Sequence, residues 1–72
     1  PIIINASNEI LVDQFIKKKI PFLSIQKIIL AILGDKNYKK YAIKTTKNIN
    51  QINKIDLWAK SLTMKKIKLY NE

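Results

Sequence analysis

The stretch Ser24-Ile25-Gln26-Lys27-Ile28-Ile29-Leu30-Ala31-Ile32-Leu33-Gly34 has the clearest helical pattern in this sequence. Its apolar residues recur at intervals of three and four, which places them on one face of an α-helix. These residues are Ile25, Ile28, Ile29, Ile32 and Leu33. Ser24 precedes the run as a helix cap, and Gly34 follows it as a stop. The pattern predicts an amphipathic helix over residues 24–33 with its apolar face in a core.

A second helix is expected on the N-terminal side, over residues 5–18. Asn5 is a favourable N-cap residue for it. The residues that then share one face are Leu11, Val12, Phe15 and Ile16. Pro21 separates the two helices, because the residue before a proline disfavours helical geometry. The isoleucines at 2–4 are too few to span a membrane and are interpreted as a buried strand or a docking segment.

On the C-terminal side, residues 35–47 are polar and are expected to form a long loop with a short extended stretch at most. Asn48 is predicted to cap a helix over 48–54. Asp56 is predicted to cap a separate last helix over 56–68, rather than to lie inside a continuous one. The predicted face of that helix carries Ile55, Trp58, Ala59, Leu62 and Leu69. The expected fold class is all-α: a small antiparallel bundle of three to four short helices, forming one domain over residues 1–72.

The composition excludes several kinds of site. The chain has no cysteine and no histidine, and it has one glycine. The sequence therefore lacks the residues for disulfide bonds, for the usual zinc sites and for a nucleophile activated by histidine. One glycine is also too few for a glycine-rich phosphate loop. Glu9 and Asp13 lie one helical turn apart and are the acidic pair to consider for a cation. A solvated acidic face is the favoured interpretation of this pair.

The chain carries a net charge of +9, from fourteen lysines and no arginine. Strong positive charge is typical of proteins that bind nucleic acid or an anionic surface. Arginine, however, is the residue that recognises phosphate and guanine through paired hydrogen bonds. Lys, Ile and Asn share AT-rich codons, so a biased genome accounts for the lysines without an anionic partner. We therefore expect neither nucleic acid nor a membrane as partner.

Asn5, Asn8 and Glu9 lie across the first turns of the predicted helix at 5–18, where they could contact a ligand. A structural role is favoured. Asn5 caps the helix, Glu9 meets the positive end of the helix dipole, and Asn8 satisfies a buried backbone group or a neighbouring domain. Trp58 shares a face with Ile55 and Leu62, so we interpret it as a core or interdomain anchor rather than a stacking platform.

Three stretches together resemble one protein family in their order and approximate spacing. Asn5-Ala6-Ser7-Asn8-Glu9, followed by Val12 and Phe15, resembles an N-A-A/S-N-E-x-x-V-x-x-F block. Lys19-Ile20-Pro21-Phe22-Leu23-Ser24-Ile25 is similar to a K-I-x-F-x-D-I block, and Asp56-Leu57-Trp58-Ala59-Lys60 to a D-x-W-A-R block. The family is the C-terminal helical domain of 1-deoxy-D-xylulose 5-phosphate reductoisomerase. Ser24 replaces the acidic cap of that pattern, and Lys60 replaces the arginine.

The resemblance implies that this chain is a non-catalytic part of a larger enzyme. In that family an N-terminal Rossmann domain binds NADPH, and a central domain holds a divalent cation (Mg or Mn) and the substrate phosphate. The enzyme rearranges the carbon skeleton of its substrate and reduces the resulting aldehyde, in the non-mevalonate pathway of isoprenoid biosynthesis. No catalytic, cofactor-binding or metal-binding residue of the family maps onto this chain. The residues with an implied structural or interdomain role are Asn5, Asn8, Glu9, Phe22, Asp56 and Trp58.

The resemblance also implies partners and a location. The helical domain is expected to pack against the catalytic and NADPH-binding domains that precede it, in a homodimeric enzyme, and to brace the catalytic domain. The AT-rich composition adds the expectation of a plastid-type organelle (an apicoplast) or a bacterial cytoplasm. The alternative hypothesis is an independent basic helical module that binds nucleic acid or an anionic surface.

Overall fold

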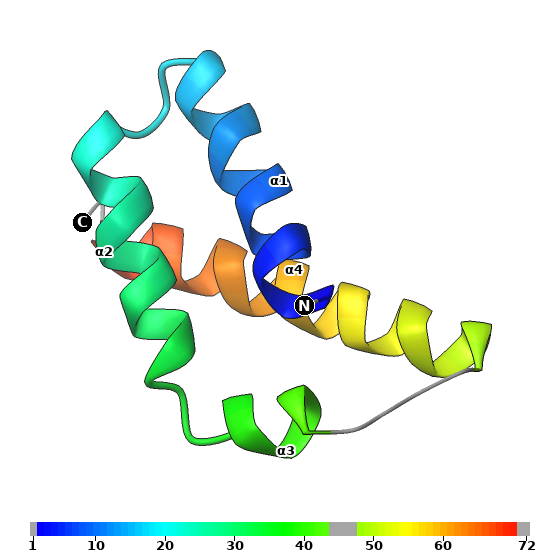
Figure 1. The fold of residues 1–72 in the computed structure, drawn as a ribbon. Coiled ribbons are helices and arrows are strands. Elements are labelled where there is room, and N and C mark those ends of the chain that lie inside the picture. Colours follow the sequence, from blue (N-terminus) through cyan, green and yellow to red (C-terminus); the bar gives the residue numbers. More distant parts are fainter. Residues whose placement is uncertain (1, 44–47, 71–72) are drawn as a thin grey trace.

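The computed structural model describes residues 2–43 and 48–70, which form α1 (Ile2–Ile16), α2 (Phe22–Leu33), α3 (Tyr38–Ala42) and α4 (Ile49–Tyr70) (Figure 1). These two described ranges contain no strand, so the predicted all-α class is confirmed. None of the described helices is long and apolar enough to cross a lipid bilayer.

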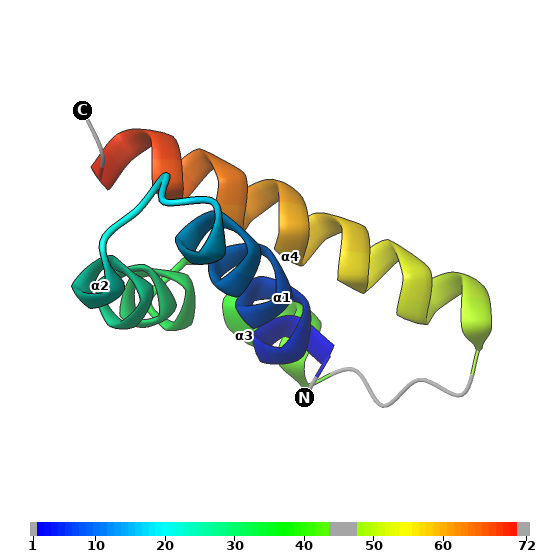
Figure 2. The ribbon, with the colours of Figure 1, turned by 90° about the horizontal axis from the view of Figure 1, so that it is seen from above.

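The helices are arranged in two layers. α1 and α2 run side by side in opposite directions, joined at one end by the turn at residues 17–21 (Figure 1). α4 crosses both helices, and both lie on the same side of it (Figure 2). The short helix α3 lies near the start of α1. The α1–α2 pair therefore has one side against α4 and an opposite side that faces away from it.

An apolar core lies between these two layers. On α4 the buried residues are spaced four apart, so they form one stripe along the helix. They are Ile55, Ala59, Thr63 and Ile67. The other layer and its turn contribute the buried apolar residues Ile3, Ala6, Leu11, Ile20, Ile28 and Ile32. The stripe confirms the predicted places of Ile55 and Ala59. Leu69, however, is 69% exposed, because the stripe continues through Thr63 and Ile67 instead.

Two hydroxyl groups are buried in this core. The Thr63 Oγ1 donates to the Ala59 carbonyl oxygen at 2.7 Å, which satisfies it within α4. The Ser7 Oγ has no hydrogen-bond partner among the described residues. The predicted apolar face of α2 is confirmed at its centre, where Ile28 and Ile32 are fully buried, whereas Leu33 at its edge is 42% exposed.

The predicted start of the first helix is wrong. α1 begins at Ile2 instead of Asn5, and the run of isoleucines is helical rather than extended. Ile3 and Ala6 are buried, so an additional helical turn brings apolar surface into the core and extends the helix. Asn5 is therefore an exposed residue inside α1 and does not cap it.

The predicted cap of the second helix is also wrong. α2 begins at Phe22, with Pro21 at the N-cap in an extended conformation (φ −73°, ψ 157°) and without a side-chain cap. Ser24 is the third helical residue, and its N–H donates to the Pro21 carbonyl oxygen at 3.0 Å. Pro21 therefore takes the N-cap position, because its ring fixes φ and its carbonyl oxygen accepts a hydrogen bond from the first turn of the helix.

The C-terminal half forms one long helix, so the predicted division into helices at 48–54 and 56–68 is wrong. Asn48 caps α4 as expected, because its Oδ1 accepts a hydrogen bond of 2.7 Å from the Asn50 N–H. Asp56 lies inside the helix, where its carboxylate pairs with Lys60 one turn later at 3.0 Å. An i,i+4 ion pair stabilises a continuous helix at the position where sequence alone suggests a new start.

The segment between α2 and α4 is partly helical. α2 ends at Gly34 as predicted, although the glycine has a right-handed φ of −87°. The Asn37 N–H donates to Asp35 Oδ1 at 2.9 Å, and the Tyr38 N–H donates to the Asp35 carbonyl oxygen at 3.0 Å. This local turn leads into α3, where a loop was predicted, and residues 35–43 contain no extended stretch. Residues 44–47 lie outside the described part of the chain.

The turn between α1 and α2 holds Lys18 in the left-handed conformation, with a φ of 59°. The Lys18 N–H donates to the Phe15 carbonyl oxygen and the Lys19 N–H to the Gln14 carbonyl oxygen, both at 2.9 Å. This pair of bonds is the Schellman arrangement that closes many helices, usually with glycine at the left-handed position. A residue with a Cβ atom costs about 1–2 kcal/mol in that conformation.

Lys18→Gly is expected to raise the free energy of unfolding by up to about 1 kcal/mol, because glycine adopts the left-handed conformation without a Cβ clash. Urea denaturation of the chain measures the change. Lys18→Ala is the matched control, since it removes the same charge but keeps the Cβ atom, and it should leave stability nearly unchanged. Equal gains in the two variants would assign the effect to the lysine charge and not to the backbone.

Candidate functional site

An ion-pair cluster connects α1 to α4. The Lys60 Nζ lies 3.0 Å from Asp56 Oδ2 within α4 and 3.6 Å from Glu9 Oε2 of α1. Glu9 belongs to the first of the three family-like blocks of the sequence, and Asp56 and Lys60 belong to the third. The fold thus brings these two blocks together around one lysine. The spacing of residues in the sequence did not reveal that Glu9 pairs with this lysine.

The ion pairs alter the titration of Lys60. The hydrogen bond to Asp56 raises the pKa of Lys60 above its usual value, and the negative charges of Asp56 and Glu9 act in the same direction, while partial burial opposes them. A lysine held between two carboxylates therefore occupies the place of the arginine in the family-like pattern. The lysine ammonium group acts as a single point charge, whereas an arginine guanidinium can form two parallel hydrogen bonds to one carboxylate.

The acidic pair of Glu9 and Asp13 is engaged with lysines. Asp13 Oδ2 lies 3.0 Å from the Lys17 Nζ one turn later, and Glu9 pairs with Lys60. The ion pair between Asp13 and Lys17 joins residues one helical turn apart on α1 and the turn that follows it. Within the described ranges, no group of three or more acidic residues is arranged to hold a metal ion.

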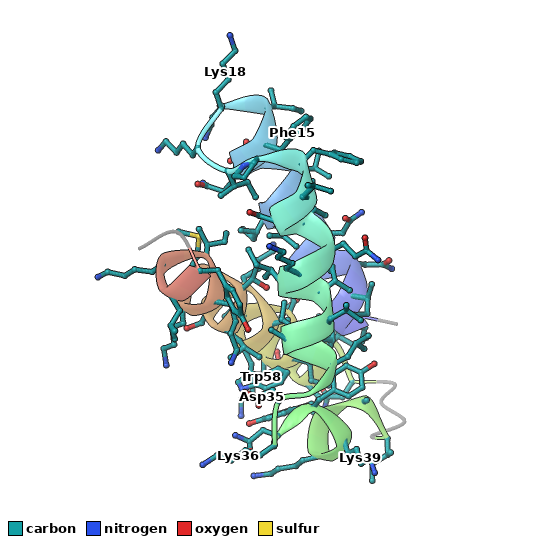
Figure 3. The ribbon with its side chains drawn as sticks, turned by 90° about the vertical axis from the view of Figure 1, so that its left-hand side faces the viewer. Phe15, Lys18, Asp35, Lys36, Lys39 and Trp58 are labelled. Atoms are coloured by element: carbon teal, nitrogen blue, oxygen red, sulfur yellow. The ribbon has the colours of Figure 1, made fainter. Side chains whose placement is uncertain are left out.

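Trp58 anchors α3 to α4. Its ring stacks on the ring of Tyr41 of α3, with centroids 4.3 Å apart and an interplanar angle of 26°. The Lys40 Nζ lies 5.7 Å from the centroid of the Tyr41 ring. Trp58 is half-buried against the core, at the end of the molecule where α3 lies (Figure 3). This packing agrees with the interpretation of Trp58 as an anchor, whereas a contact with another domain stays a prediction.

A small hollow lies beside this stack, lined by Tyr41, Gln51, Lys54 and Ile55, with a volume of about 70 Å³. Pockets for small-molecule ligands usually measure about 300–1,000 Å³. The hollow is therefore too small to enclose a nucleotide cofactor.

The remaining predicted site residues lie on the surface. Asn8 is exposed, so it satisfies no buried group within this domain, and its role toward a neighbouring domain stays a prediction. Phe22 is 68% exposed, and its ring and that of Phe15 form an edge-type contact with centroids 5.6 Å apart and an interplanar angle of 63°. This contact joins the end of α1 to the start of α2.

The lysines that the structure describes are not gathered in a single patch. Lys18 lies at one end of the structure, while Lys36 and Lys39 lie at the opposite end (Figure 3). Proteins that bind nucleic acid usually cluster their basic residues in a patch or stripe. The spread of these side chains is what a lysine-rich composition produces on solvated surfaces.

Sequence reasoning missed two features of this region. The i,i+4 spacing of Asp56 and Lys60 was a detectable sign of an ion pair, but the contribution of Glu9 depends on how α1 packs on α4. The stack of Tyr41 on Trp58 had no sign in the sequence, because Tyr41 lies in a segment predicted to be a loop.

Comparison with known proteins agrees with the residue pattern. A family model described as the DXP reductoisomerase C-terminal domain matches residues 1–62. The chain therefore belongs to this family, as its resemblance predicted.

Two curated relatives bear the same full name, 1-deoxy-D-xylulose 5-phosphate reductoisomerase. The protein from Acetivibrio thermocellus is 34% identical over 68 residues, which cover 94% of this chain and 16% of the relative. The protein from Pelotomaculum thermopropionicum is 29% identical over 72 residues, which cover 99% of this chain and 17% of the relative. The chain thus spans about a sixth of the length of these relatives. No solved structure matches it.

Replacing Lys60 should reduce stability in a pH-dependent way. Its pKa in the folded chain lies above the usual 10.5, so its ion pairs contribute fully below about that pH and are lost as the pH rises through the folded pKa. Lys60→Gln should therefore lower the unfolding midpoint at pH 8 relative to the unaltered chain, and the difference should vanish in strong alkali. Lys65→Gln on the same helix is the control. A deficit of Lys60→Gln that persists unchanged in strong alkali would show that packing, not charge, is responsible.

Tyr41→Ala is expected to leave the ring of Trp58 more hydrated and to shift its fluorescence to longer wavelength. Stacked aromatic pairs contribute about 0.5–1.5 kcal/mol beyond the area they bury, so stability should fall by at least that amount. Trp58 is the chain's single tryptophan, so emission reports on this site alone. Tyr70→Ala removes a tyrosine that is 52% exposed and serves as the control. An unshifted spectrum in Tyr41→Ala would mean that the stack does not persist in solution.

Proposed function

We propose that this chain is the C-terminal domain of a full-length, NADPH-dependent 1-deoxy-D-xylulose 5-phosphate reductoisomerase of the non-mevalonate isoprenoid pathway. In this proposal the domain is non-catalytic and braces the catalytic part of the same polypeptide. The observation that carries it is the family match over residues 1–62, together with relatives that bear this name and are about six times as long.

The chemistry of the described residues supports a non-catalytic role for this part. Glu9 and Asp56 converge on the ammonium group of Lys60, and Asp13 pairs with Lys17. Among the described residues no three acidic side chains gather as the ligands of a metal ion do. The hollow beside Tyr41 is too small for a dinucleotide. Neither feature offers a site for NADPH or a divalent cation among the described residues, and we assign their binding to the preceding domains of the polypeptide.

A bracing role is supported by the way the domain is held together. The Glu9–Lys60–Asp56 cluster fixes α1 on α4, and the Tyr41–Trp58 stack fixes α3 on α4. These contacts, together with the apolar core, hold the described helices in one packed unit, as a bracing domain requires. The composition further supports a plastid-type organelle or a bacterial cytoplasm as the location, and we propose a homodimer as the state of the whole enzyme.

The proposal is tested with the polypeptide that carries this sequence in its natural gene. It should oxidise NADPH when 1-deoxy-D-xylulose 5-phosphate and Mg²⁺ or Mn²⁺ are supplied. The loss of NADPH absorbance measures this reaction. Glu9→Gln should lower its thermal midpoint and leave turnover within a few-fold at a permissive temperature, because Glu9 lies in a structural ion pair. A polypeptide without this activity would refute the assignment. A thousand-fold loss of turnover in Glu9→Gln at an unchanged midpoint would refute the non-catalytic role.

A further inference from the structure

The sides of α1 and α2 that face away from α4 form a continuous surface, which we call the outer face. We define it by three exposed residues of each helix: Asn8, Val12 and Phe15 of α1, and Phe22, Gln26 and Leu33 of α2. Within each helix these residues are spaced by three, four or seven, so they lie on one side. The edge contact between the Phe15 and Phe22 rings joins the two strips.

The outer face is strongly apolar for an exposed surface. Phe22 is 68% exposed, Leu33 42%, and Val12 and Phe15 40% each. Leu23 and Leu30 of α2 extend it and are 70% and 60% exposed. Large apolar patches of this kind on soluble proteins mark sites of interaction with other protein surfaces.

The six residues that define the outer face are all uncharged, although the chain has fourteen lysines. None of these lysines lies in α1, and α2 has one, Lys27, which is at the edge of the face. Glu9 is turned toward Lys60 of α4. The remaining polar residues of the face, Asn8 and Gln26, are uncharged amides. Protein interfaces are depleted of lysine in the same way at their centre, with phenylalanine enriched.

This charge pattern decides which kind of partner fits. A nucleic acid or an anionic membrane would be bound by lysines, and the outer face has none. A second protein surface that is apolar and uncharged matches it. About five-sixths of each curated relative lies outside the part that this chain matches, and that remainder supplies such a surface within one molecule.

We infer that the outer face is the surface through which this domain docks on the rest of its own polypeptide. The inference rests on the proposed function, because it takes the remainder of the reductoisomerase chain as the occupant. Val12, Phe15, Phe22 and Leu33 form the dry centre of the contact, and the amides of Asn8 and Gln26 form hydrogen bonds across it. The lysines of the turn at residues 17–19 stay outside, at the rim.

The test is site-specific photo-crosslinking in the full-length polypeptide. Phe22→p-benzoylphenylalanine places a reactive group on the outer face and replaces one exposed aromatic ring with another, so the fold is preserved. Leu57→p-benzoylphenylalanine is the matched control, since Leu57 is 66% exposed on α4. The products are mapped by mass spectrometry, and reductoisomerase activity is assayed on the same samples.

We expect the Phe22 variant to form crosslinks within one polypeptide, to residues upstream of this domain, at a yield at least ten times that of the Leu57 variant. A Phe22 yield no higher than that of Leu57 would overturn the inference. Crosslinks from Phe22 to the same domain of a second copy would overturn it in favour of a dimer interface. Absent activity alongside intramolecular crosslinks would refute the proposed function while the docking surface stands.

Discussion

The structure depends on one stripe of α4. Ile55, Ala59, Thr63 and Ile67 recur at intervals of four and are buried, so a single side of this helix supports both α1 and α2. A chain of 72 residues buries only about 60% of its unfolded surface, and a core of this size is marginal. A long helix that contacts two others increases the buried area without further elements. Ala59 is fully buried in the stripe, and its small side chain takes up little space where the helices meet.

The orientation of α1 follows from its buried side. Ile3, Ala6 and Leu11 lie in the core, and a rotation of α1 would expose them to solvent. The ion pair between Glu9 and Lys60 adds a polar contact of 3.6 Å between α1 and α4. Val12 and Phe15 lie outside the buried side of α1 and are partly exposed. The orientation of α1 thus leaves apolar residues available to a neighbour, at the expense of the domain's own core.

The distribution of charge separates two kinds of surface. The lysines lie mainly in the turns, on α3 and on α4, and they give the domain its positive charge. The surface of α1 and α2 away from α4 is uncharged and apolar. A lysine-rich composition explains the first surface without a partner, whereas the second has apolar exposure that a free domain gains nothing from. Membership of a family whose curated relatives are about six times longer supplies the setting for such a surface.

The sequence by itself determined the all-α class, the core face of α2, the cap at Asn48 and the family, because periodicity and local motifs are encoded in neighbouring residues. It misplaced the starts of α1 and α2 and divided α4 at Asp56, since burial of Ile3 and of the stripe from Ile55 to Ile67 outweighed the local capping preferences. Only the tertiary structure decided that Glu9 meets Lys60 and that Tyr41 stacks on Trp58. These contacts join residues far apart in the chain, and their formation depends on how the helices pack.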